Sequence, residues 1–369
     1  MPNKLNLYIL KKFFYYFILT LFVLSAILFI GDFVEQFRKS AGKEITIKII
    51  LQLALLNFPS LLYFTLPLMI FFSSILSFLS LIRSSEKIII NSVGISNLNI
   101  TLPAVCLYVF ICIIFITAAN PLIAIFNERY SELEYKYIDR IDKFASITKN
   151  GLWLKQDNSK KNISSVLYAK NIKDQGRYLI DFMILEYDQN GSFQGRLDGT
   201  SAKLHNGFWE MQNTQISPKY GDTSFEEKIT YNTNIKLEDI TDSLSSPSSI
   251  SIWRLVKFIN FLESLGYSAI DFKMHLYDLI FLPFFAASLV FLASSLILNL
   301  KQNDKFTKTI MYSVIAIFAV YFLSNLFDAL GSSSQLSPII SKVLLPLIIT
   351  LISTIIYLSG IVRKQLQYE

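Results

Sequence analysis

The chain has 369 residues, of which 52% are apolar, 14% aromatic and only 17% charged. Soluble domains carry about 25% charged residues, so much of this protein's surface must face something other than water. The net charge of +6 is spread over short basic clusters, and binding to nucleic acid is not expected because none of them forms a broad basic face.

Hydrophobic runs predict three membrane spans in the first third of the chain, since about 20 residues cross about 30 Å of hydrocarbon. These runs are Phe13–Ile30, Ile49–Ile82 and Leu102–Phe126. The second exceeds one span and contains Pro59 and Pro67, which predicts one tilted or kinked helix rather than two short ones. Pro103 is expected in the first turn of the third helix, where proline is tolerated.

The first span resembles a secretory signal in its basic start, but its run is long. The sequence Gly31-Asp32-Phe33-Val34 that follows is a poor cleavage site,. We therefore expect it to stay in the protein as an anchor. The third span contains the two cysteines, Cys106 and Cys112, which point to different faces of a helix and are not expected to form a disulfide.

Beyond residue 126 the composition becomes polar and predicts an inserted β domain. A charged helical extension over 127–145 is expected first. Short strands are expected at Leu152–Lys155, Ser165–Ala169, Tyr178–Tyr187, Gly199–Leu204 and Phe208–Gln212. Asn190-Gly191 and Asn206-Gly207 are strong hairpin signals between such runs. Five to eight short strands predict a sandwich or a jelly roll.

The chain returns to the membrane through an acidic, Ser/Pro-rich linker, Leu237–Ser249, and an amphipathic helix. Ile252, Leu255, Ile259 and Leu262 recur at helical spacing, and Gly266 is expected to end that helix. Three further spans are predicted at Leu276–Leu298, Ile310–Leu330 and Ile339–Ile361.

The predicted fold class is therefore an α-helical membrane protein with six transmembrane helices (3+3) and a β-jellyroll-like domain inserted between helices 3 and 4. The expected domains are 1–126, with transmembrane helices 1–3, then 127–250, with the β domain, then 251–369, with the connector and helices 4–6.

Lysine and arginine in the short segments predict the orientation. With an inner N-terminus, ten of these residues lie inside: Lys4, Lys11, Lys12, Arg83, Lys87, Lys301, Lys305, Lys308, Arg363 and Lys364. Four lie outside: Arg38, Lys39, Lys43 and Lys48. The chain is therefore expected to be a bacterial inner-membrane protein, with both termini in the cytoplasm and the β domain in the periplasm.

Motifs for catalysis are absent from the sequence. There is no G-x-x-x-x-G-K-[ST], no G-x-S-x-G and no H-E-x-x-H,. The two histidines, His205 and His275, lie in unrelated regions, which disfavours a metal site. We expect no enzyme activity and no cofactor.

Three polar stretches remain as candidate functional sites. At the outer end of the first span, Glu35, Arg38 and Lys39 share a helix face, and the two cations suit an anionic lipid headgroup. Interfacial charges that snorkel give the same pattern. Asn325, Asp328 and Gln335 near the fifth and sixth spans are a weaker signal.

The third stretch is the loop 84–94 between spans two and three. Ser84 or Ser85 can cap a short helix, Glu86 suits its positive end, and Gly94 can end it. Exposed Ile89, Ile90 and Val93 would then fit an apolar groove on a partner. A helix lying on lipid headgroups is the alternative.

The chain resembles the YjgP/YjgQ permease family, the LptF and LptG membrane subunits of the lipopolysaccharide exporter. The resemblance extends over nearly the whole chain and rests on weak motifs in a specific order. They are Tyr8-Ile9-Leu10-Lys11, Phe33-Val34-Glu35-Gln36-Phe37-Arg38-Lys39, Ser85-Glu86 with Gly94, Gly151-Leu152-Trp153, Ser251-Ile252-Trp253-Arg254-Leu255, Gly266 and Pro283.

The resemblance implies a permease that pairs with a sister permease as an LptF/LptG heterodimer and extracts lipopolysaccharide. It implies a cytoplasmic ATPase dimer (LptB) and periplasmic bridge proteins (LptC, LptA) as partners. By position, Arg38 and Lys39, with Glu35 beside them, match the lipid phosphate contacts. Ser85, Glu86, Ile89, Ile90, Val93 and Gly94 match the helix that couples to the ATPase.

Two positions depart from the family pattern: Asp32 stands where some members carry a lysine, and Asp278 stands where a lysine is common in the fourth span. The headgroup contacts implied by the resemblance are therefore open in detail. The sequence also leaves open which of the two sister permeases this chain is. The alternative function is a membrane-anchored scaffold whose β domain binds envelope partners, and an ion-coupled transporter is a weaker third.

Overall fold

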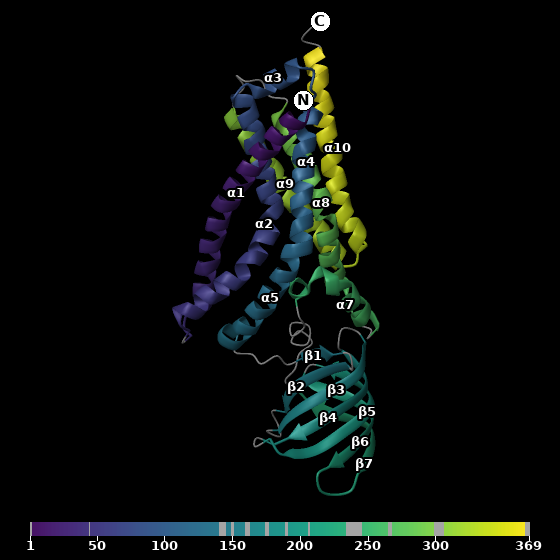
Figure 1. Cartoon of the computed structure of the whole chain (residues 1–369). Coiled ribbons are helices and arrows are strands. Elements are labelled where there is room, and N and C mark those ends of the chain that lie inside the picture. The colour runs from purple at the N-terminus through teal and green to yellow at the C-terminus, as the bar shows by residue number, and fades with distance from the viewer. Residues whose placement is uncertain are drawn as a thin grey trace. The chain divides into compact units, whose positions relative to one another are not determined.

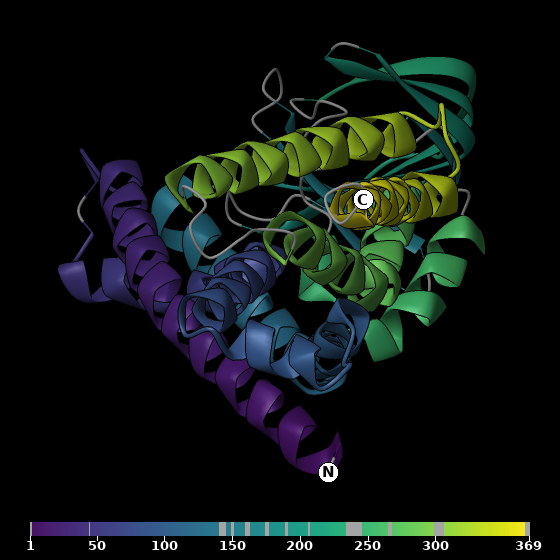
Figure 2. The same ribbon diagram turned by 90° about the horizontal axis from the view of Figure 1, so that it is seen from above.

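The structure is a computed structural model (Figures 1 and 2). It describes residues 2–43, 45–139, 145–148, 151–158, 163–173, 177–188, 191–205, 207–233, 246–264, 268–298 and 306–365. The chain forms two compact units: Met1–Asn127 together with Lys273–Glu369, and Glu128–Phe272. The first unit is helical and the second contains the sheet.

Among the described residues, six helices are long and apolar enough to cross a membrane, which confirms the predicted six spans. The helical unit contains α1 (Pro2–Lys39), α2 (Ile47–Arg83), α3 (Glu86–Ser92), α4 (Asn97–Ile114), α8 (Ile270–Ile297), α9 (Phe306–Ser332) and α10 (Pro338–Gln365). α3 is the short helix between the second and third spans.

The second span is one continuous helix, as predicted, with Pro59 and Pro67 inside it. Its most apolar stretch is 72% buried within the chain, against 11% for α1. Phe78 of α2 packs edge-on against Phe13 of α1 with ring centroids 4.9 Å apart, and the hydroxyls of Ser73 and Tyr108 lie 2.7 Å apart. α2 is therefore the core helix of this unit.

The third span begins earlier than expected, at Asn97, because Ser96 caps the helix by accepting a hydrogen bond from the Asn99 backbone N–H at 3.3 Å,. Pro103 consequently lies inside the helix, so the prediction that it occupies the first turn was wrong. The helix continues through a π segment at Phe115–Ala119, α5 (Asn120–Glu134) and a second π segment at Tyr135–Asp139. This confirms the charged extension as far as Asp139; residues 140–144 lie outside the described residues.

The sheet unit has seven described strands: β1 (Ala145–Thr148), β2 (Gly151–Asn158), β3 (Ile163–Lys173), β4 (Tyr178–Tyr187), β5 (Phe193–His205), β6 (Phe208–Pro218) and β7 (Ser224–Asn232). The five predicted strands are present, and β4 has the predicted bounds. β1 was missed because it is only four residues long. β7 was missed because its first five residues are exposed, which leaves no alternation of apolar and polar side chains,.

The strands form one antiparallel sheet in the order β1-β2-β3-β4-β5-β6-β7 (Figure 1). The predicted β domain is thus present, but its described strands follow one another as a meander and lack the Greek-key connections of a jelly roll. Short connections favour this order because each strand pairs with the next along the chain.

Side-chain contacts show that this sheet curls. The indole N–H of Trp209 on β6 donates to Oε1 of Gln156 on β2 at 3.0 Å. The hydroxyl of Tyr231 on β7 donates to that of Ser165 on β3 at 3.1 Å. In a flat sheet, strands four places apart would be separated by about 19 Å, so the sheet bends until its first and last strands share one core.

The two predicted hairpins are consistent with the backbone, since Gly191 and Gly207 have φ of +78° and +88°,. Asn190 and Asn206 lie outside the described residues, as do Gly266 and positions 237–245 of the expected linker. The predicted amphipathic helix is α7 (Ile252–Ser264), with Leu255, Ile259 and Leu262 buried.

Candidate functional site

α3 lies at the same end of the helical unit as the start of α1 and the end of α10 (Figure 1). It has two distinct faces. One is attached to neighbouring helices through charged side chains, and the other is apolar and exposed. This division makes α3 the first candidate site.

The attached face begins with Glu86. Both of its carboxylate oxygens lie 2.9 Å from the ammonium of Lys12 on α1, and the Ser84 hydroxyl donates to Oε1 at 2.7 Å. Burial opposes ionisation of Glu86, but the hydrogen bonds from Ser84, Lys12 and Tyr8 outweigh it and lower its pKa,. Glu86 therefore remains an anion in contact with α1.

Lys87 and Ile90 complete the attached face. Lys87 is 7% exposed and its ammonium donates to the backbone carbonyl of Leu298, which directly follows α8. A cation is favourable there because the carbonyls at a helix C-terminus carry partial negative charge. Ile90 is buried and helps to hold α3 against its neighbours. The prediction that Ile90 is exposed toward a partner was therefore wrong.

The exposed face consists of Ile88, Ile89 and Val93, which are 57%, 63% and 74% exposed. Ile89 and Val93 were predicted for this role, and Ile88 was missed because a helix of two turns gives too short a pattern to fix its face. Ser85 occupies the N-cap position with φ of 57° but forms no side-chain cap, so the capping prediction was wrong. Gly94, with φ of +84°, follows the helix as predicted.

The other end of α1 holds the predicted cations. The Arg38 guanidinium donates to both oxygens of Glu35, at 2.9 and 2.7 Å. The Arg38 side chain is 77% exposed, and Lys39 is also exposed. Asp32 accepts a hydrogen bond from Asn57 of α2 at 2.8 Å. Asp32 therefore joins two helices, while Arg38 and Lys39 face outward.

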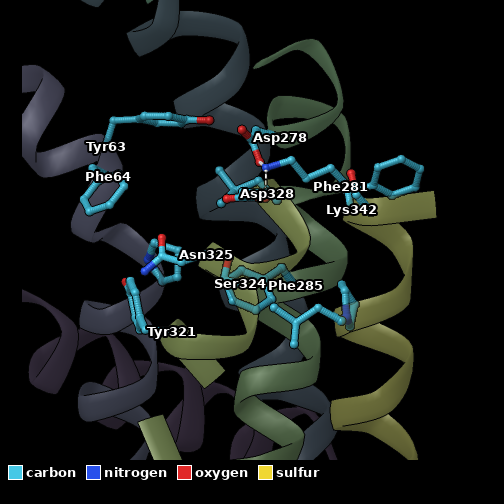
Figure 3. A pocket seen from close by; sticks show the side chains of 15 residues that line it. Tyr63, Phe64, Asp278, Phe281, Phe285, Tyr321, Ser324, Asn325, Asp328 and Lys342 are labelled. Carbon is cyan, nitrogen blue, oxygen red and sulfur yellow. Dashed lines mark hydrogen bonds and ion pairs between the residues drawn. The ribbon is translucent and has the colours of Figure 1, made fainter. Parts of the chain in front are cut away.

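A third polar group connects α8, α9 and α10 (Figure 3). The Lys342 ammonium lies 2.5 Å from Oδ1 of Asp278 and 2.5 Å from Oδ1 of Asp328. Its side chain is only 9% exposed. We name Asp278, Asp328 and Lys342 the ion triad. It ties the last three spans together within a segment of low polarity.

The ion triad forms part of the wall of a cavity of about 150 Å³. Four aromatic side chains from α2 and α8 also line it, and Tyr321, Ser324 and Asn325 add polar groups from α9 (Figure 3). Asp328 and Asn325 were noted from the sequence, but Gln335 lies in the exposed turn after α9. Lys342 was missed, although a lysine in the second turn of a span was a signal.

The side chains of these sites form ion pairs and apolar contacts. Among the residues that the structure describes, no three His, Cys, Asp or Glu side chains gather in a way that could hold a metal ion. His205 stacks on Phe208 with ring centroids 5.1 Å apart, and His275 packs edge-on against Tyr63 at 6.3 Å.

Six spans, divided three and three along the chain by an inserted antiparallel sheet and with a short two-faced helix between the second and third, are the plan of a multi-pass membrane permease with a β domain. The sequence profile of the family described as lipopolysaccharide export system permease LptF/LptG matches residues 7–359. The chain belongs to this family. It is therefore an inner-membrane, multi-pass transport subunit, and a non-transporting scaffold is not favoured.

Two curated relatives agree with this membership. The lipopolysaccharide export system permease proteins LptG of Escherichia coli K12 and of Escherichia coli O6:H1 are each 22% identical to this chain over 346 residues. The match covers 92% of this chain and 94% of each relative.

Proposed function

We propose that this chain is one half of a permease pair that lifts lipopolysaccharide out of the inner membrane, driven by a cytoplasmic ATPase that docks on α3. The observation that carries the proposal is the division of α3 into an attached face and an exposed apolar face. Ile88, Ile89 and Val93 expose more than half of their side chains on one short helix, and such a surface is typical of a helix that binds in a groove.

The energetics require a partner of this kind. Moving an acyl chain from the bilayer to water costs about 0.8 kcal/mol for each CH₂, and the chain has no P-loop with which to bind and hydrolyse ATP,. The work must therefore come from another subunit through a contact at the cytoplasmic surface. The start of α1, the end of α10 and α3 share that surface in the proposed orientation, which the excess of Lys and Arg in the inner segments supports,.

The proposed test of α3 is recovery of the ATPase when the tagged permease is purified from native membranes in mild detergent. Ile89→Asp should reduce that recovery at least about tenfold, because a charge placed in an apolar interface core must be desolvated without a partner. Asn91→Asp is the matched control, since Asn91 is an exposed residue of the same helix. Equal recovery with Ile89→Asp and Asn91→Asp would reject α3 as the docking helix.

A sister permease is proposed to cover the poorly buried spans. Only 11% of the most apolar stretch of α1 and 17% of that of α9 are buried within this chain. Figure 2 shows α1 along the outside of the helical unit. A second permease of similar size should therefore be recovered in the same purification.

Arg38 and Lys39 are proposed to meet the lipid phosphates at the periplasmic end of α1. The ion pair of Arg38 with Glu35 is exposed, and such a pair contributes little to stability because water screens its charges,. A phosphate can therefore displace Glu35 at little cost and accept two hydrogen bonds from the guanidinium.

Lipid crosslinking from a photoreactive residue near the end of α1 tests this contact. Changing Arg38 and Lys39 together to Glu should reduce crosslinking to lipopolysaccharide. Lys48→Glu is the control, because Lys48 is an exposed cation at the start of α2. Unchanged crosslinking in the double variant would reject the phosphate contact.

The β domain is proposed to pass the lipid to a periplasmic bridge. Its inner face is apolar, with Leu152, Leu167, Ile184 and Trp209 fully buried, and is therefore suited to acyl chains. The proposal requires this interior to open, because its side chains now fill it. Crosslinks from a photoreactive residue at position 184 to lipopolysaccharide, formed only when ATP is supplied, would support the passage, and their absence would oppose it.

A further inference from the structure

Glu86 belongs to the proposed docking helix, but its carboxylate does not lie on the docking face. Both oxygens contact the ammonium of Lys12 at 2.9 Å, and 13% of the Lys12 side chain and 25% of the Glu86 side chain are exposed. The Ser84 hydroxyl donates to the same carboxylate. Glu86 thus has its charged partner inside this chain, on α1.

Lys12 is held in place at the α1 side of this contact. Its ammonium lies 5.7 Å from the centroid of the Tyr8 ring, one helical turn earlier. The next residue, Phe13, is fully buried against Phe78 of α2. The neighbouring cation Lys11 is exposed. Lys12, and not Lys11, is therefore fixed in position to receive Glu86.

Charged contacts carry much of the attachment of α3 to the other helices. α3 has only seven residues, and Glu86 and Lys87 at its start reach α1 and the end of α8, respectively. A partly buried ion pair resists separation because either charge left alone pays its desolvation cost. A displacement of α3 therefore pulls on both α1 and α8.

We propose that Lys12 is a positioning residue of the transport cycle, whose ion pair with Glu86 transmits movement of the docked α3 to the adjacent end of α1. The inference rests on the proposed role of α3 as the docking helix. In this proposal Glu86 acts on α1 through Lys12. α1 is the span whose other end carries Arg38 and Lys39, so the pair joins the ATPase contact to the helix that meets the lipid headgroup.

Charge reversal tests whether the essential partner of Glu86 is Lys12 or a residue of the ATPase. The full complex is reconstituted with this chain as wild type, Lys12→Glu, Glu86→Lys or the double reversal, and lipopolysaccharide released per ATP hydrolysed is measured. Each single variant should lower that ratio at least about tenfold, and the double reversal should restore it to within about threefold of wild type. Lys11→Glu, the matched control, should leave the ratio unchanged.

Two results would overturn the proposal. The first is a ratio of lipopolysaccharide released per ATP hydrolysed that is no higher for the double reversal than for Glu86→Lys alone, which would place the essential partner of Glu86 on the ATPase. The second is a wild-type ratio for Lys12→Glu.

Thiol crosslinking tests the contact without the ATPase. In a chain with Cys106→Ser and Cys112→Ser, cysteines at positions 12 and 86 should be joined by a short bis-maleimide in native membranes, and cysteines at 11 and 86 should be joined far less. Equal crosslinking of the two pairs would reject the Lys12–Glu86 contact. Failure of the wild-type chain to bring down any ATPase would instead reject the proposed function, so the two failures are distinguishable.

Discussion

Replacement of Lys342 by methionine is the most informative test of the helical unit. The substitution keeps the length and apolar stem of the side chain and removes the positive charge that pairs with Asp278 and Asp328. Removing one member of a buried ion pair costs about 3–5 kcal/mol. We expect a loss of stability of about 3 kcal/mol, the lower end of that range, because the side chains of Asp278 and Asp328 are 43% and 40% exposed,.

A loss of this size changes the unfolding equilibrium constant by roughly a hundredfold. It should lower the melting temperature by about 6–12 °C in a unit of about 200 residues. Cys112 supplies a native reporter, because it is fully buried in α4. In a Cys106→Ser background, the temperature at which a maleimide dye labels Cys112 marks the opening of the helical unit. Lys48→Met is the control for loss of an exposed lysine.

Removing the two carboxylates as well shows whether the loss of charge causes the destabilisation. Asp278→Asn and Asp328→Asn, added to Lys342→Met, remove the two unpaired carboxylates, so the labelling temperature should recover most of its loss. The reasoning would be refuted by Lys342→Met labelling at the wild-type temperature. It would also be refuted by a triple variant as unstable as the single one, since the loss would then come from packing of the lysine stem.

Three further outcomes are expected. Gly199→Ala should destabilise the sheet by about 2 kcal/mol in urea unfolding followed by tryptophan fluorescence, because its Cβ would lie 2.3 Å from the buried ring of Phe182,. Tyr231→Phe should cost about 1 kcal/mol in the same assay, since the Ser165 hydroxyl loses a buried partner,. Wild type should be more stable than Glu86→Gln, with the whole difference present above the ordinary carboxylate pKa of about 4.3. The difference should vanish as the pH falls through the lowered pKa that Glu86 has in the folded protein,.

Controls and contrary results for these three are specific. Gly195→Ala, whose Cβ would meet nothing closer than 3.4 Å, should be tolerated; equal destabilisation at Gly195 and Gly199 would remove the steric explanation. Tyr220→Phe, at an 83% exposed site, should be neutral, and an equal loss there would contradict the role given to the buried hydroxyl. For Glu86, thermal unfolding followed by helical circular dichroism from pH 7 to pH 3 gives the stability difference, and a difference that grows in acid would contradict the sign derived from its pKa,.

The sequence alone determined the features that depend on a short stretch of chain. The six spans, the strand Tyr178–Tyr187 and the amphipathic helix with Leu255, Ile259 and Leu262 could be predicted because apolar residues recur with the period of the local structure or fill a bilayer's thickness. The order of motifs also carried the family resemblance. Those features require no knowledge of which distant residues meet.

Only the tertiary structure decided which charges are partners. Lys12 and Glu86 are 74 positions apart, and Lys342 meets carboxylates from two other spans, so no local period connects them. The same holds for the curl of the sheet, which appears only when Gln156 and Trp209 are seen in contact. Periodicity shows that a side chain is buried, but the helix and strand packing determines what it is buried against, because that packing is fixed by the combined shape of elements far apart in the chain.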